Sequence, residues 1–533
     1  MLIFSSIYEN AKQHKTKTCM VFNNDSITYE ELIKHVDKKS SLLEEKFQKG
    51  EKVIIKDVNP INTVVNLLSC AKAELISIPV DNKILYKSLN DIKKYTNSSI
   101  MMEDNFTYHL KENKEIFNEN ITEYNLYCKD QKKRNICHKN NTKNNNLYYY
   151  YKEDCDLYCK DDKDSKLNDN EQEEKTLGYK HKEDYNDMFL GALSSGTTGK
   201  RKVIYRDHIS WTSAFKYQSE VFNISNEDTL FLVGSLSYTA NLNSAIHMLN
   251  EGGIIVFSKS IYPKTWIRQI EDKNITSIFM VPAHYRLLLK ELKNNINNIK
   301  SLVSAGAKID IDTVKKLKHR FPKASICEYY GASELGHITY INFRENFNDD
   351  SVGKPFPGVK IWMENIEELT KKVDHNKYMI ENENLNKNWE IQHEKGRVWV
   401  ESLYIAPAFR PKATVGDIGK IDGQGNLYIL GRENGIINKG GVKILPYEVE
   451  KILNKHPKIV QSVVFPIADN MKGQEVAAVI LTKDIALTRK EIMDYCREHL
   501  DRHKHPKKIN IVSNIKLNSS GKIDISKLIK NIY

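Results

Sequence analysis

The feature that most restricts the fold of this chain is a strand–helix–strand pattern in residues 52–80. The runs KVIIKDV and LISIPV are short and rich in β-branched residues, and the segment INTVVNLLSCAKA between them has the apolar spacing of a helix. Strands joined by a crossover helix pair in parallel, and parallel sheets carry helices on their faces. The pattern therefore predicts a layered α/β fold.

Helix-start signals agree with this interpretation. Thr28 and Glu31 form a capping-box pattern ahead of an apolar helical face, and Thr488 and Glu491 form a second one near the end of the chain. Alternation of strand and helix patterns resumes after residue 187 and continues to about residue 340. Because 533 residues exceed what one core usually supports, we expect two domains. The first is a large layered α/β domain with parallel sheets over 1–431, and the second is a small α+β domain over 432–533.

Residues 138–184 differ from the rest of the chain. They contain KNNTKNNN, YYYY and KDDKDSKLNDNEQEEK and almost no aliphatic side chains. Such a segment cannot bury enough apolar area to offset the entropy of ordering, so we expect a disordered low-complexity insertion. Cysteines in and just before it leave a zinc site open as an alternative, although their spacing matches no standard C-x₂-C pattern.

Composition limits the classes of partner. The formal net charge is +11, but no Lys/Arg block alternates with aromatic residues, so we expect no nucleic-acid partner. The N-terminal sequence lacks the basic start and apolar core of a signal peptide, and no apolar run is long enough for a transmembrane segment. Eight cysteines in such a chain are typical of reduced thiols, so we expect a cytoplasmic protein.

The segment SSGTTGKRK at 194–202 combines glycines, hydroxyls and cations, which together suit an anion-binding loop. A Walker P-loop requires lysine directly after its second glycine, and here Thr197 follows Gly196. The loop therefore predicts a phosphate site of another kind.

Four further motifs follow the loop along the chain: YGASE at 330–334, GD at 416–417, GRENG at 431–435 and NSSGKID at 518–524. In this order the five segments resemble the core motifs of the adenylate-forming superfamily, which includes acyl-CoA synthetases and adenylation domains. The resemblance extends over nearly the whole chain outside the insertion. It implies activation of a carboxylic acid by ATP and Mg²⁺ as an acyl-adenylate, with release of pyrophosphate, and transfer of the acyl group to coenzyme A.

The resemblance also implies residue roles. Lys522, Glu334 and Thr198 would be catalytic, with Glu334 as the Mg²⁺ ligand. Asp417 and Arg432 would bind the ribose, and Ser333 would lie beside the α-phosphate. Residues of the loop and of the adenine site would complete the nucleotide pocket: Ser195, Gly196, Thr197, Gly199, Lys202, Ala305, Gly306, Ala307, Tyr330 and Gly331.

The resemblance implies that GSLSYTANLNSAIH at 234–247 lines the site of the acid. Amino-acid-activating members of the superfamily place an Asp in this stretch to pair with the α-ammonium, whereas this sequence has no carboxylate there. We therefore expect an acid other than an α-amino acid, bound near Tyr238, Leu242 and Gly306. Helix-core packing is the alternative for Ile246. YRDHISW at 205–211 resembles provisionally named long-chain fatty acid–CoA ligases of Gram-positive bacteria and favours a fatty acid. A stand-alone adenylation enzyme that loads an aryl or acyl acid onto a separate carrier protein, and a weakly active binding homologue, remain alternatives.

The resemblance also implies rotation of the small domain about a hinge at Asn434. The chain departs from the usual motif there and beside the phosphate loop, at Arg201, Val203, Asn434, Gly435 and Lys516. None of these departures removes a charged catalytic group, so we expect activity to persist.

Overall fold

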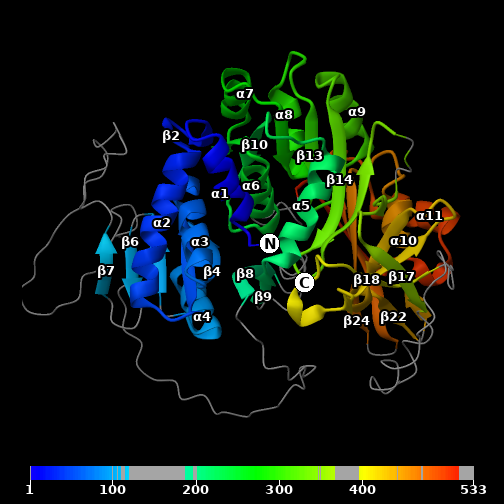
Figure 1. Ribbon diagram of the computed structural model, residues 1–533. Helices are drawn as coiled ribbons and strands as arrows, with labels where there is room; N and C mark the ends of the chain where they lie inside the picture. The colour runs from blue at the N-terminus through cyan, green and yellow to red at the C-terminus, as the bar shows by residue number, and fades with distance from the viewer. Residues whose placement is uncertain are drawn as a thin grey trace, which may run out of the picture.

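The computed structural model describes residues 2–98, 100–104, 106–109, 114–118, 187–195, 201–345, 347, 350–365, 395–440, 442–469 and 472–514 (Figure 1). The expected insertion at 138–184 and its neighbouring cysteines lie outside the described residues, as do Gly196, Thr197, Thr198, Gly199 and Lys522.

Two large sheets form the body of the molecule, and the first has seven strands in the order β7-β6-β5-β3-β4-β8-β9. The predicted strand–helix–strand unit is confirmed as β3, α3 and β4, with Lys52 beside Ile76 in a parallel pair. Asn59 caps α3 by accepting a hydrogen bond from the Ile61 amide at 2.9 Å. The strands are β3 (Lys52–Asp57), β4 (Ile76–Asp81), β5 (Ile100–Glu103), β6 (Phe106–His109), β7 (Lys114–Asn118), β8 (Met188–Ser195) and β9 (Arg201–Asp207).

The second sheet has nine strands in the order β16-β15-β14-β13-β12-β10-β11-β1-β2, and its centre, from β14 to β1, is parallel. Parallel order brings the carboxyl ends of β10, β12, β13 and β14 to one edge. The strands are β1 (Thr18–Phe22), β2 (Asp25–Thr28), β10 (Thr229–Val233), β11 (Ile254–Ser258), β12 (Ser277–Met280), β13 (Ser301–Ser304), β14 (Ser325–Ala332), β15 (Gly336–Asn342) and β16 (Lys354–Pro355).

Helices cover both large sheets, as parallel sheets require. Thr28 caps α2, where its hydroxyl accepts a hydrogen bond from the Glu31 amide and the Glu31 carboxylate accepts one from the Thr28 amide, so the predicted capping box is confirmed. The helices of this region are α1 (Ser5–Gln13), α2 (Tyr29–Lys46), α3 (Pro60–Lys72), α4 (Tyr86–Thr96), α5 (Ile209–Phe222), α6 (Thr239–Glu251), α7 (Pro263–Asp272), α8 (Pro282–Glu291) and α9 (Ile311–Arg320).

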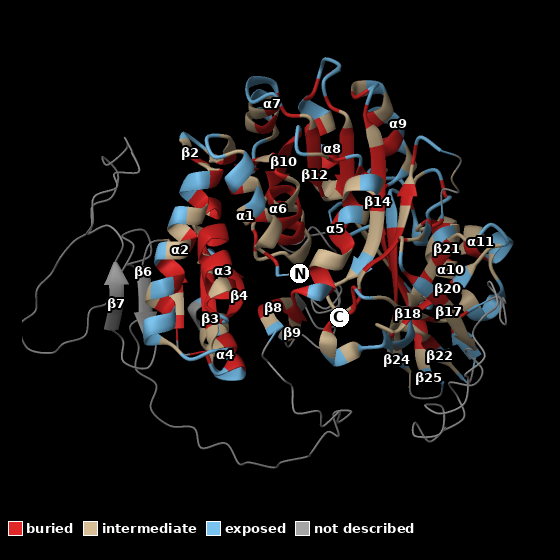
Figure 2. Ribbon diagram, in the orientation of Figure 1, coloured by how far each residue is buried: buried red, intermediate tan, exposed pale blue. Residues whose placement is uncertain are grey.

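The largest apolar core joins the two sheets, with residues of β3, α3, α6 and β10 packed in one continuous cluster. A second cluster lies beneath α7, α8 and α9 on the other face of the nine-stranded sheet. Figure 2 shows this pattern: α3, α6 and the central strands are almost wholly buried, whereas the outer faces of α2 and α7 are exposed.

Within the part of the chain that the structure describes, two five-stranded sheets complete the fold. One contains β17 (Lys360–Asn365), β18 (Gly396–Glu401), β19 (Lys412–Ala413), β20 (Asp417–Ile421) and β21 (Leu427–Arg432). The other contains β22 (Ile437–Lys439), β23 (Val442–Ile444), β24 (Gln461–Asp469), β25 (Gly473–Leu481) and β26 (Lys508–Val512), packed with α10 (Pro446–Leu453) and α11 (Arg489–His499). This last group has a separate apolar core, and its α+β character agrees with the expected fold class.

Among the described residues, no helix has the length and apolar character needed to cross a membrane.

Candidate active site

Tyr330 and Arg432, singled out from separate motifs, meet at Asp417 of a third motif. The carboxylate of Asp417 accepts a hydrogen bond from the Tyr330 hydroxyl through Oδ2 and from Arg432 Nε through Oδ1, the latter at 2.9 Å. Asp417 and Arg432 face each other across the antiparallel pair of β20 and β21, and Tyr330 comes from β14. Asp417 is buried, while Arg432 is half exposed. The sequence motifs thus converge on one polar cluster.

Tyr330 is a hydrogen-bond donor in this cluster. Burial, and next the nearby carboxylate of Asp417, raise the pKa of Tyr330 well above that of a free phenol. The phenol therefore keeps its proton at neutral pH. A carboxylate offers about four lone-pair positions, so Asp417 can accept further donors besides Tyr330 and Arg432.

The YGASE segment makes a tight connection from β14 to β15. A Cβ atom on Gly331 would lie 2.4 Å from the carbonyl oxygen of Gly336, so only glycine fits this close approach. Gly336 has a φ of +72° and packs against Tyr404. Ser333 and Glu334 lie in this connection, where both are half-buried.

Arg206, which the sequence analysis did not single out, holds this connection in place. Its guanidinium is 2% exposed and donates hydrogen bonds to the carbonyl oxygens of Ser333 at 2.8 Å and Tyr404 at 2.6 Å. A third hydrogen bond reaches the carbonyl of Ser210 at 2.9 Å. Burial lowers the pKa of Arg206 to about 9, so the guanidinium remains charged at neutral pH.

The neighbouring Asp207 supports the same region from β9. Its carboxylate forms a two-pronged ion pair with Arg410, with N–O distances of 2.8 and 2.9 Å. Arg410 belongs to the segment that follows Tyr404, so Arg206 and Asp207 together tie this segment to β9. Both residues lie in YRDHISW, and the structure therefore gives that motif a positioning function beside Ser333.

The SAGA segment follows β13, the neighbour of β14. Ala305 is buried, whereas Gly306 and Ala307 are exposed, and Gly306 has a φ of +87°. Glu328 of β14 anchors the end of this loop, because its Oε1 accepts a hydrogen bond from the Ile309 amide at 2.6 Å. Glu328 was not predicted from the sequence, although a carboxylate directly before Tyr329 and Tyr330 is an unusual feature of an otherwise apolar strand.

Glu328 provides a pH test of this anchor. Burial raises the pKa of Glu328 from 4.5 to about 7, against the opposing hydrogen bond from the Ile309 amide. Between these values the folded protein binds a proton that the unfolded chain does not, so stability is lost as pH rises. Glu328→Gln keeps an acceptor without the titration. We expect urea unfolding to show the variant gaining about 1–2 kcal/mol relative to the parent between about pH 5 and pH 8.

The control is Glu345→Gln on an exposed carboxylate close to the end of β15. A substitution at this surface position should change the free energy of unfolding by less than about 0.5 kcal/mol. A constant difference between Glu328→Gln and the parent across this range would contradict the assignment.

The remaining candidates are placed only in part. Ser195 ends β8, Lys202 lies exposed in β9, and Ser195 pairs with Arg201 across this hairpin. Residues 196–200 of the phosphate-loop motif lie outside the described residues, whereas Arg206 of β9 reaches the YGASE connection. Tyr238 precedes α6, and Leu242 is 1% exposed within the main core. Ile246 is fully buried there, in agreement with the helix-core alternative.

Comparison with known proteins gives two family matches. A family model described as AMP-binding enzyme matches residues 7–377, and a model described as AMP-binding enzyme C-terminal domain matches residues 448–522. Among curated proteins, the uncharacterized acyl–CoA ligase YhfT of Bacillus subtilis is 29% identical over 352 residues, 64% of this chain and 68% of YhfT. VraA of Staphylococcus epidermidis, provisionally named a long chain fatty acid–CoA ligase, is 27% identical over 332 residues, 62% of this chain and 68% of VraA.

Solved structures with similar folds include MatB from Rhodopseudomonas palustris with bound ATP. It superposes with a TM-score of 0.73 at 16% identity, over 100% of this chain and 99% of MatB. MenE, the O-succinylbenzoate coenzyme A synthetase of Bacillus subtilis in complex with ATP and a magnesium ion, gives a TM-score of 0.70 at 16% identity, over 98% of this chain and 99% of MenE. At this level of identity the similarity establishes the adenylate-forming fold.

Proposed function

The chain belongs to the AMP-binding enzyme family, and from that premise we propose that it ligates a fatty acid to the thiol of coenzyme A. The names of YhfT and VraA support an acid–CoA ligase, and the name of VraA supports a fatty acid as the acid. The observation that carries the proposal is the meeting of Tyr330, Asp417 and Arg432 from three separate motifs.

The proposed reaction has two steps. A carboxylate oxygen of the acid attacks the α-phosphorus of ATP, and pyrophosphate leaves with the electrons of the broken P–O bond. The thiol of coenzyme A then loses its proton and attacks the acyl carbon, and AMP leaves. Both steps concentrate negative charge, so oriented donors and cations are the groups expected to lower the barriers.

The described residues fit the nucleotide in these steps. Asp417 has lone pairs free for the ribose hydroxyls in addition to the bonds from Tyr330 and Arg432. Tyr330 lies on β14, whose neighbour β13 leads into the SAGA segment, where adenine would stack, and Gly331 would border the same pocket. The phosphates would meet the loop at 195–202, and Ser333 would lie beside the α-phosphate.

Mg²⁺ fits the same region by donor chemistry. Mg²⁺ bound to a nucleotide commonly takes one or two carboxylates and fills its remaining positions with phosphate oxygens and water. Among the described residues no cluster of three or more His, Cys, Asp or Glu side chains forms a dedicated metal cage. Glu334, half-buried in the connection that Arg206 holds, would supply the carboxylate, and the ion would neutralise phosphate charge.

The purified chain tests the proposal through ATP–pyrophosphate exchange with short, medium and long fatty acids and with aryl acids, followed by a thioester assay with coenzyme A. Exchange and thioester formation with a fatty acid is the expected result. Exchange without transfer to coenzyme A would favour loading of a separate carrier protein. Lack of exchange with every acid would favour a binding homologue.

Asp417→Ala is expected to raise the KM for ATP about 10- to 100-fold, the effect of losing hydrogen bonds to a charged group, with little change in the KM for the acid. Asp422→Ala is the matched control, because Asp422 lies in the turn of the same β20–β21 hairpin and accepts the hydroxyl of Tyr428 at 2.8 Å. The KM for ATP of both variants is measured by steady-state ATP–pyrophosphate exchange. An equal rise in the KM for ATP in both variants would contradict a ribose-binding role for Asp417.

A further inference from the structure

We infer that Asp57 is a positioning residue for the acid-binding loop, defined here as residues 234–238, which connects β10 to α6. The inference rests on the proposed function, with the acid bound near Tyr238 as the sequence predicts. Asp57 is the last residue of β3 in the seven-stranded sheet, and its side chain is fully buried. Asp57 is far from the loop in sequence, because its partners Ser235 and Leu236 lie 178 and 179 positions further along the chain.

Both oxygens of the buried carboxylate are saturated with donors. Oδ2 accepts hydrogen bonds from the Ser235 hydroxyl at 2.7 Å and from the Leu236 amide at 2.8 Å. Oδ1 accepts one from the Thr63 hydroxyl at 2.9 Å and pairs with Lys259 Nζ at 3.0 Å. A buried carboxylate is stable only when it is paired and hydrogen-bonded in this way.

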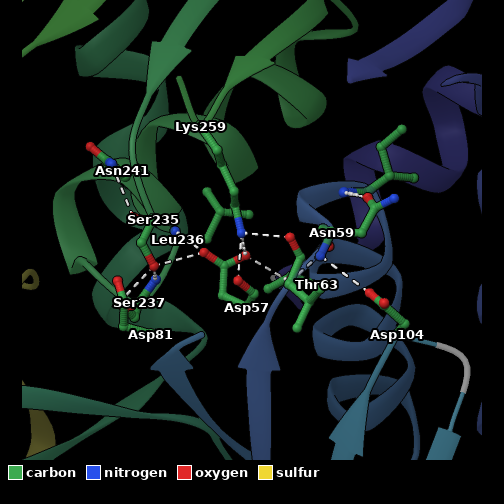
Figure 3. Close-up of polar contacts among 12 residues, drawn as sticks. Asp57, Asn59, Thr63, Asp81, Asp104, Ser235, Leu236, Ser237, Asn241 and Lys259 are labelled. Atoms are coloured by element: carbon green, nitrogen blue, oxygen red, sulfur yellow. Dashed lines mark hydrogen bonds and ion pairs between the residues drawn. The ribbon is translucent and has the colours of Figure 1, made fainter. Parts of the chain in front are cut away.

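The donors come from segments that adjoin the two large sheets, as Figure 3 shows. Thr63 belongs to α3 beside β3, whereas Ser235 and Leu236 follow β10 and Lys259 follows β11 of the nine-stranded sheet. Lys259 also donates to the carbonyl oxygens of Asp57 and Val58 at 2.5 and 2.9 Å. Asp57 therefore joins the carboxyl edges of two sheets at the acid-binding loop.

The bond to the Leu236 amide fixes the loop that leads into α6. The Ser235 hydroxyl also bonds to that of Ser237 at 2.9 Å, and Asn241 of α6 donates to the Ser235 carbonyl at 3.0 Å. Leu236 is fully buried, and Tyr238 follows two residues later at the start of α6. Loss of the Leu236 bond would thus shift Tyr238 and the first turn of α6 without touching the nucleotide cluster at Asp417.

Asp57→Asn is a nearly isosteric test. One end of the amide is now a donor, so it must oppose either Leu236 N or Lys259 Nζ, neither of which can accept a hydrogen bond. We expect the KM for the acid in ATP–pyrophosphate exchange to rise about tenfold or more, while the KM for ATP and the kcat change little.

Asp57→Asn combined with Lys259→Met should restore the loop. With the ammonium gone, the amide nitrogen can face Thr63, whose hydroxyl accepts, and the amide oxygen can face Leu236 N. The double variant should therefore have a KM for the acid close to that of the parent. Its melting temperature should stay below that of the parent, because two backbone carbonyls lose their donor. A purely structural role would make the double variant worse in both measurements.

Asp228→Asn is the matched control. Asp228 is 2% exposed at the opposite end of β10, where it pairs with Lys300 at 2.6 Å and accepts the Ser225 amide at 2.7 Å. This variant should lose melting temperature without a change in the KM for the acid. Two results would overturn this inference alone if the parent is active. One is an unchanged KM for the acid in Asp57→Asn, and the other is an equal rise of that KM in Asp57→Asn and Asp228→Asn. A parent without exchange on any acid overturns the proposed function and this inference with it.

Discussion

Replacement of Lys522 by alanine is expected to lower the rate of acyl-adenylate formation about 100- to 1,000-fold, the effect of removing one oriented charge from a transition state. The acid carboxylate and the α-phosphate of ATP are both anionic and repel each other as they approach. An ammonium between them reduces that repulsion and orients the attack. The proposal rests on the NSSGKID motif, since Lys522 lies outside the described residues.

The two half-reactions separate this role from a general loss of folding. Thioester formation from pre-made acyl-adenylate and coenzyme A has no phosphoryl attack, so Lys522→Ala should retain most of that rate. Lys527→Ala removes a lysine five positions further along the chain and serves as the control, with both half-reactions near the parental rates. Equal losses in the two half-reactions of Lys522→Ala would argue against this assignment.

Local sequence signals predicted the elements of the fold better than their order in the sheets. The β-branched runs at 52–58 and 75–80 became β3 and β4, and the helical pattern at 61–73 became α3. The pairing of β1 with β11, in which Met20 faces Ile255, has no local signal. Strand pairs so distant in sequence depend on the packing of whole helices between sheets, which a pattern within a short window does not contain.

The candidate site shows the same division. Tyr330, Asp417 and Arg432 were predicted together because each lies in a motif with a recognisable composition, and the structure brings them into contact. Arg206 and Asp57 were not predicted, because the function of a buried charge depends on partners that are distant along the chain. The available signal was weak: each is a charged residue next to β-branched or aromatic residues at the end of a strand, in VIIKD and VIYRD.

The position of Arg206 predicts the largest loss of stability. Arg206→Met retains much of the apolar stem but removes the donors to the carbonyl oxygens of Ser333, Tyr404 and Ser210. These contacts are shielded from water, and each buried acceptor left unpaired costs about 1–3 kcal/mol. We expect the free energy of unfolding in urea to fall by about 3 kcal/mol or more.

Arg344→Met tests whether burial, rather than the number of hydrogen bonds, determines the loss of stability. Arg344 also donates to three backbone carbonyls, those of Ala324, Phe321 and Pro322, at 2.9, 3.0 and 2.9 Å. Arg344 is exposed near the opposite end of β14, so water can replace its donors and the loss should stay below about 1 kcal/mol.

Because Arg206 also holds Ser333 beside Glu334, Arg206→Met should lose ATP–pyrophosphate exchange under conditions where most of the protein is still folded. Similar losses of stability in the two variants, or full exchange activity in Arg206→Met, would show that burial of this guanidinium does not position the YGASE connection.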